Sequence, residues 1–332
     1  MITRAYNYAI LNGSFSNDIG LSEGKSGLAL FLYYYGKHLN STYHLEVAFS
    51  FLEEIIDQTN ESSSQNYAGG ITGFGSLLEH LNSKRLLNQE AGGILEEIEV
   101  EILKTVYTGN FKSINVSDGA AGYGMYLLAR LTSVNYIEPL LQARIRETLI
   151  LIIDILRKNA GIIPNDYFAL LNFLGKVKNL GIYEPVTIDL YHHFLSSWKA
   201  HCADSAKATI AYNLYTLNGR NNNVSANAIF SEITELTKDS LPSNTCKALF
   251  YLCVLQSITG SDNRDSKATD NLVQLLTNNL RHFSMSQIFP FREEQKAINA
   301  GLTLGVGGLG LSLLSFATND YSWLDLCPAY EF

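Results

Sequence analysis

Six of the side chains in the second half of the chain that could bind a metal lie between residues 192 and 246. They are His192, His193, His201, Cys202, Asp204 and Cys246. Zinc in proteins is held tetrahedrally by thiolate, imidazole and carboxylate groups, so a site here would use Cys202, Asp204 and Cys246. However, the spacing matches no closed zinc motif, and cysteines without a Cys-x-x-Cys pair are typical of packing thiols. We therefore expect no cofactor, with zinc as the alternative.

Two acidic residues stand where expected helices begin. Glu23 and Asp118 each directly precede a glycine that leads into an apolar run. A pair of carboxylates roughly 5–9.5 Å apart can hydrolyse a glycosidic bond, which makes a sugar-active enzyme one hypothesis. Acidic residues at a helix start are also explained by capping and by the helix dipole, and we favour that interpretation.

Four tyrosines fall at or after the expected helix starts. They are Tyr67, Tyr123, Tyr126 and Tyr212. A tyrosine combines a large apolar ring with a hydrogen-bonding hydroxyl, which suits it to contact a peptide. We predict that some of them line the mouth of a cavity and bind a peptide there.

The elements that would position these residues form a repeat. Pairs of glycines three positions apart lead into apolar segments four times, at Gly24 and Gly27, Gly70 and Gly73, Gly119 and Gly122, and Gly305 and Gly308. Two such glycines share one face of a helical turn and allow backbones to approach. Their freedom in φ would also suit a tight turn before the helix.

The repeat predicts helical hairpins throughout the chain. We expect short inner helices to begin near residues 24, 70, 119, 166, 209, 247 and 305. Longer amphipathic outer helices are expected over 45–57, 94–106, 140–156, 184–198, 225–237 and 266–283, where apolar residues recur at helical spacing. Periodicity alone does not decide between an open superhelix and a closed barrel.

These hairpins resemble the lanthionine synthetase C-like (LanC-like) family. The strongest matches are the segments that begin at Gly27, Gly73, Asp118 and Gly305, and the resemblance covers about residues 20–316. It implies an all-α fold, an α/α toroid of about seven inner and six to seven outer helices, forming a single domain over residues 1–332. No sequence is obvious for a seventh outer helix, so we expect a thin seam in the ring, with the tail 321–332 packed there.

The resemblance also implies a zinc-dependent chemistry, and this chain has other residues at most of the positions that carry it. Family cyclases add a cysteine thiol to a dehydrated serine or threonine of a precursor peptide, using zinc held by two cysteines and a histidine. The family's third-repeat aspartate falls on Asn115, and its fourth-repeat His-Gly pair falls on Asn165 and Asp166. The sixth-repeat Cys-His-Gly motif falls on residues 242–244, and the fifth-repeat ligand falls on Asp204, near Cys202. An amide cannot exchange a proton as a carboxylate does.

Composition excludes several other functions. The net charge is −8 without a basic cluster, which argues against binding to nucleic acid or to an anionic membrane. No apolar run approaches the roughly 20 residues of a membrane span, and no signal peptide is visible. We expect a cytoplasmic protein with free thiols.

The sequence therefore predicts a LanC-like protein in the maturation of a ribosomal peptide. We expect a zinc-free pseudoenzyme that binds a precursor peptide or a peptide-modifying enzyme. The alternatives are an active zinc-dependent cyclase with a displaced metal site, and a sugar-active α/α barrel enzyme.

Overall fold

A computed structural model describes most of the chain. The described residues are 1–60, 63–84, 91–109, 111, 113–133, 138–201, 231, 233–237, 241–259, 266–290, 298–302 and 305–327. Their regular secondary structure is helical, without a strand, which confirms the predicted all-α class. The chain divides into two compact units. Unit 1 is Met1–Thr59 with Asp204–Tyr330 and Phe332, and unit 2 is Asn60–Ala203 with Glu331.

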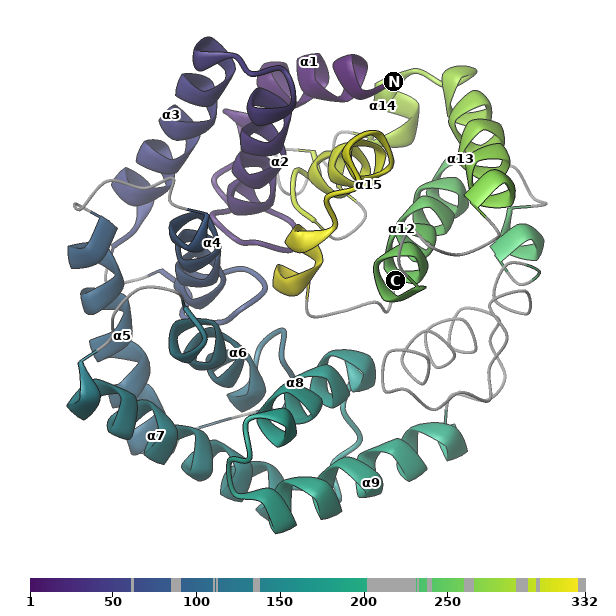
Figure 1. The fold of residues 1–332 in the computed structure, drawn as a ribbon. Coiled ribbons are helices and arrows are strands. Elements are labelled where there is room, and N and C mark those ends of the chain that lie inside the picture. The colour runs from purple at the N-terminus through teal and green to yellow at the C-terminus, as the bar shows by residue number, and fades with distance from the viewer. Residues whose placement is uncertain are drawn as a thin grey trace. The chain divides into compact units, whose positions relative to one another are not determined.

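Unit 2 consists of three successive hairpins. Its inner helices are α4 (Ile71–Ser83), α6 (Ala120–Leu131) and α8 (Tyr167–Asn179), and its outer helices are α5 (Ala91–Thr108), α7 (Pro139–Lys158) and α9 (Glu184–His201). Helix α6 packs between α4 and α8, and each inner helix contacts the outer helix that follows it (Figure 1). All six of these helices were predicted from the sequence.

Unit 1 repeats this arrangement around α15 (Val306–Thr318), which packs between α2 (Lys25–His38) and α12 (Pro242–Thr259) (Figure 1). The outer helices α3 (Thr42–Gln58) and α13 (Ser266–Arg281) contact α2 and α12. A short helix, α14 (Met285–Ile288), carries a capping box at Ser284.

The N-terminal helix α1 (Ile2–Gly13) was missing from the prediction. It packs against both α15 and α2, and the Tyr6 ring stacks on Tyr35 with the centroids 4.3 Å apart. The α15 hairpin thus receives its outer helix from the start of the chain. The expectation that no sequence supplies this helix is wrong, because α1 precedes the first inner helix instead of following the last.

The C-terminal segment packs on the inner helices of unit 1. It forms the 3₁₀ helix η1 (Ser322–Leu326). The buried Trp323 donates from its indole Nε1 to Ser315 Oγ of α15 at 2.7 Å, and its ring packs edge-on against Phe250 of α12. Within the tail that was expected to cover a seam, Trp323 therefore contacts both α15 and α12.

Inner and outer helices differ in burial, as their sequences indicate. Every residue of α6 from Ala120 to Leu128 is buried, whereas α3 buries one stripe made of Ala48, Phe51, Leu52 and Ile55. A helix that is surrounded by other helices needs an apolar surface on all sides. In the part of the chain that the structure describes, no helix is long and apolar enough to cross a membrane.

The loop before each glycine-led helix has one repeated structure. The N–H after the lead glycine donates to the carbonyl of the residue six positions before that glycine. The pairs are Lys25 to Asp18 at 2.8 Å, Ile71 to Ser64 at 2.9 Å, Ala120 to Ser113 at 3.1 Å and Val306 to Asn299 at 3.2 Å. The side-chain oxygen of the same residue accepts from the N–H two positions on, at Gly20, Asn66, Asn115 and Gly301. Short polar side chains favour such turns, so Asp, Ser or Asn occupies each position.

The lead glycines are needed for space. Gly70 and Gly119 have φ of −137° and −128°, an extended conformation open to any residue. A Cβ on Gly119 would lie 2.3 Å from the carbonyl oxygen of Ser113, and one on Gly70 would lie 2.1 Å from that of Ser64. The predicted role of φ freedom is therefore wrong, and close approach of the loop backbone is the reason for glycine.

In three inner helices, a glycine inside the helix allows the neighbouring inner helix to pack closely. A Cβ on Gly124 of α6 would lie 2.5 Å from the Phe173 ring of α8, and one on Gly75 of α4 would lie 2.8 Å from the Tyr126 ring of α6. In unit 1, a Cβ on Gly310 of α15 would come within 2.3 Å of the Phe31 ring of α2. An aromatic ring on one inner helix thus fills the space that glycine leaves on the next.

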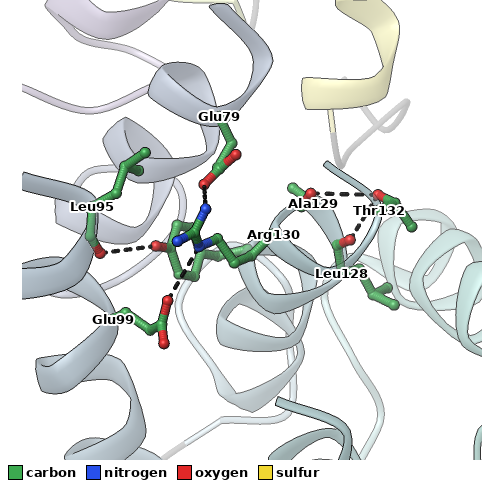
Figure 2. A network of polar contacts seen from close by, with 8 residues as sticks. Glu79, Leu95, Glu99, Leu128, Ala129, Arg130 and Thr132 are labelled. Carbon is green, nitrogen blue, oxygen red and sulfur yellow. Dashed lines mark hydrogen bonds and ion pairs between the residues drawn. The ribbon is translucent and has the colours of Figure 1, made fainter. Parts of the chain in front are cut away.

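Unit 2 also contains a buried ion-pair network, which Figure 2 shows. The Arg130 guanidinium of α6 lies 2.9 Å from Glu79 Oε1 of α4 and 3.2 Å from Glu99 Oε2 of α5. The three side chains are 12%, 1% and 6% exposed. Burial raises the pKa of both carboxyls, and Arg130 opposes that rise.

Candidate functional site

The two positions predicted to correspond to the family's acid–base residues lie together in unit 2. Asn115 lies in the loop before α6, and Asn165 lies just before α8. The Asn165 N–H donates to Asn115 Oδ1 at 3.0 Å. The two residues are 50 positions apart in the sequence, and the fold brings the backbone of Asn165 into contact with the Asn115 side chain. The Asn115 side chain also donates from Nδ2 to Asp118 Oδ1 at 3.0 Å.

A second hydrogen bond joins the same two loops. The Ser117 N–H donates to Asp166 Oδ2 at 2.8 Å. Asp166 is the first residue outside α8, and it is 6% exposed. We call the set Asn115, Ser117, Asn165 and Asp166 the loop clasp, because its two hydrogen bonds fasten the start of α8 to the loop before α6.

Asp166 is an unusual carboxyl in this clasp. Burial raises its pKa to about 6, while hydrogen bonds from the Ser117 and Val116 segment oppose the rise and the negative charge of Asp118 adds to it. Its second oxygen, Oδ1, is buried without a hydrogen-bond partner. In the sequence, Asp166 stands out only as the neighbour of Asn165, because burial cannot be deduced from a loop position.

Asp118 has a local structural role. Its Oδ1 accepts from Ser113 Oγ at 2.9 Å and from Asn115 Nδ2 at 3.0 Å, and its side chain is exposed. These bonds hold the loop that precedes α6, as the capping interpretation expected in broad terms. Glu23, its predicted partner for sugar hydrolysis, is an exposed residue of unit 1, and its carbonyl accepts from Ala300 and Gly301.

The predicted peptide-binding tyrosines are buried where the structure describes them. Tyr67 is 2% exposed, Tyr123 is 7% exposed and Tyr126 is 0% exposed. The Tyr126 hydroxyl donates to the Leu95 carbonyl at 3.3 Å, and Tyr123 packs edge-on against Phe111. This burial gives the three rings packing roles. Tyr212 lies outside the described residues.

The predicted metal ligands are only partly described. Cys202 and Asp204 lie outside the described residues, and so does the expected inner helix near 209. Cys246 is buried in α12, and burial raises the pKa of its thiol to about 12. Residues 242–244, which correspond to the family's sixth-repeat ligands, form the first turn of α12. Within the described ranges, no group of three or more His, Cys, Asp or Glu side chains is placed to hold a metal ion.

Comparison with known proteins gives one match. The family model described as lanthionine synthetase C-like protein matches residues 16–173. That range contains α2 to α7, the first half of α8, and all four residues of the loop clasp. No curated protein matches the chain.

Proposed function

Because the lanthionine synthetase C-like family model matches residues 16–173, we propose that this chain is a scaffold for peptide maturation without cyclase chemistry. In this proposal the chain holds a ribosomal precursor peptide, or the enzyme that modifies it, and does not form the thioether ring itself. Zinc-dependent cyclisation by a displaced metal site is the alternative.

The observation that carries the proposal is the pairing of Asn115 with Asn165. Thioether formation adds a thiol across the double bond of a dehydrated residue, so a proton must leave sulfur and another must reach carbon. At the two corresponding positions the chain offers amides, which do not exchange protons near neutral pH. Asn115 Oδ1 instead accepts the backbone N–H of Asn165, which gives the Asn115 side chain a structural role.

The chain also lacks some of the side chains with which the family binds zinc. The family's sixth-repeat cysteine and histidine correspond to residues of the first turn of α12 that cannot ligate as a thiolate or an imidazole. The nearby Cys246 is buried in α12, and in the absence of a metal this burial raises the pKa of its thiol to about 12. Bound zinc would supply the thiolate chemistry that these residues do not supply themselves.

A thiol-consumption assay tests this proposal. A synthetic peptide that carries one cysteine and one dehydroalanine is incubated with the protein and zinc at pH 7.5, and free thiol is followed with a chromogenic disulfide. We expect thiol loss at the rate of the protein-free control, because no positioned acid–base pair assists the addition. Faster loss that requires the protein would contradict the proposal, and its disappearance in Cys246→Ala would support the displaced metal site.

A further inference from the structure

The ion-pair network of Glu79, Glu99 and Arg130 joins three helices of unit 2 (Figure 2). Glu79 lies on the inner helix α4, Glu99 on the outer helix α5 and Arg130 on the inner helix α6. When both carboxyls are ionised, these three side chains carry two negative charges and one positive charge. Within the network, two carboxylates that are only 1% and 6% exposed therefore share one guanidinium.

Sharing the guanidinium leaves the ionised carboxylates incompletely bonded. Each of them contacts Arg130 through one oxygen, Glu79 through Oε1 at 2.9 Å and Glu99 through Oε2 at 3.2 Å. The second oxygen of Glu79, Oε2, is buried without a hydrogen-bond partner. A buried carboxylate destabilises the fold unless its oxygens are paired and hydrogen-bonded, so full ionisation of the network opposes folding.

Groups from α5 and α6 act on Glu79. Burial is the largest influence and raises the pKa of this carboxyl, and the charge of Glu99 adds to the rise. Arg130 and Ser133, which follows α6, oppose the rise. Tyr126 of α6 lies against the same network, and burial raises the pKa of its hydroxyl well above the usual range, so this side chain adds no charge.

A further helix acts on Glu99. Burial again raises the pKa of the carboxyl, and the charge of Glu96 on the same helix adds to the rise. Arg130 opposes the rise, and so does Arg144 of α7. For both glutamates the influence of burial exceeds that of the cations, so the carboxyls bind a proton more readily in the folded protein than in water.

We propose that this network takes up a proton in mild acid and thereby strengthens the packing of α4, α5 and α6. A proton on either glutamate removes one buried negative charge, and the guanidinium then pairs with a single carboxylate. The proton belongs to the pair of carboxyls, because each of them changes the affinity of the other. This pH-sensitive device goes beyond the proposed function and does not depend on it.

The proposal implies a pH dependence with a definite sign. A glutamate of the unfolded chain has a pKa of about 4.3, and the pKa values of Glu79 and Glu99 are higher than this in the folded protein. Between these values the folded state binds more protons than the unfolded state. The network's contribution to stability is therefore fully present below about pH 4 and is lost as pH rises through the folded pKa values.

Urea unfolding between pH 5 and pH 8 tests the inference on the full chain, in a Trp323→Phe background whose remaining tryptophan, Trp198, belongs to unit 2. Glu79→Gln keeps the shape of the side chain and an oxygen for Arg130, but it cannot ionise. We expect the unfolding equilibrium constant of the parent to rise roughly tenfold more across this range than that of Glu79→Gln. Glu99→Gln should flatten the pH dependence in the same way, because either substitution leaves one carboxylate for one guanidinium.

Glu97→Gln is the matched control, because it removes an exposed carboxylate from the same helix as Glu99. It should keep the full pH dependence of the parent. Infrared absorption by protonated carboxyls gives a second measurement on the folded protein, and the band that the parent loses between pH 5 and pH 8 should be weaker in Glu79→Gln and Glu99→Gln. A pH dependence that both variants retain in full overturns the inference, whatever the thiol-consumption assay shows.

Discussion

Replacing Arg130 by alanine is expected to destabilise unit 2 by about 4 kcal/mol, because it leaves two buried carboxylates without their cation. Glu79 and Glu99 lose partners at 2.9 and 3.2 Å, and their side chains are only 1% and 6% exposed. Water cannot replace the guanidinium at such depth. The expected effect is large for a single substitution.

The loss in Arg130→Ala should depend on pH. Burial raises the pKa of Glu79 and Glu99 in the folded protein, and removing the cation that opposes this rise raises both further. Carboxyls with raised folded pKa are costly in their ionised form, so the destabilisation grows as pH rises and shrinks in acid. The difference between variant and parent should be smaller at pH 5 than at pH 8.

Urea unfolding of unit 2 can be followed selectively. Of the two tryptophans in the chain, Trp198 belongs to unit 2 and Trp323 to unit 1, so a Trp323→Phe background reports on unit 2. Arg157→Ala is the matched control, because its pair with Asp154 is half-exposed and should contribute less than about 1 kcal/mol. If Arg130→Ala and Arg157→Ala lowered the free energy of unfolding equally, the buried ion-pair network would not stabilise unit 2 as expected.

Substituting alanine for Gly119 is expected to lower the free energy of unfolding of unit 2 by about 3 kcal/mol or more. The new Cβ would lie 2.3 Å from the Ser113 carbonyl oxygen and 2.7 Å from the Asn115 nitrogen, both of which are backbone atoms. Backbone cannot move aside as a flexible side chain can, so the loop before α6 must shift. That shift would also disturb the contact of Asn115 with Asn165.

The same urea experiment measures this effect. Gly161→Ala is the control, since a Cβ there has nothing within 4 Å and its backbone is not in the left-handed region. It should be neutral or slightly stabilising, because alanine restricts the unfolded chain. A Gly119→Ala protein as stable as Gly161→Ala would show that the loop adapts and that the repeated glycine is not needed for space.

The regular parts of this fold were predictable from local pattern. Helices α2, α4, α6 and α15 begin one residue after the predicted lead glycines, at Lys25, Ile71, Ala120 and Val306. This pattern predicts helix starts because the glycine before each apolar run is required by a close contact with the backbone of the preceding loop. Helix α12 begins at Pro242, earlier than the apolar run near 247 indicated. Proline is favoured at the first helical position, but the polar residues after it carry no apolar periodicity.

The candidate site was predictable only in part. The family's motifs pointed to Asn115 and Asn165, and the structure places the backbone of Asn165 in contact with the Asn115 side chain. The raised pKa of Asp166 and the partners of Arg130 depend on burial between hairpins distant in sequence. Period and spacing describe one helix at a time, so they cannot reveal such contacts.

Zinc binding tests the central claim most directly. The protein is dialysed to equilibrium against buffered micromolar zinc at pH 7.5, and bound metal is measured by elemental analysis against the Cys246→Ala variant. A LanC-like scaffold without cyclase chemistry should retain no stoichiometric zinc, and the two proteins should give the same value. One zinc per chain that is lost in Cys246→Ala would contradict this account and show that the family's metal site persists in a displaced form.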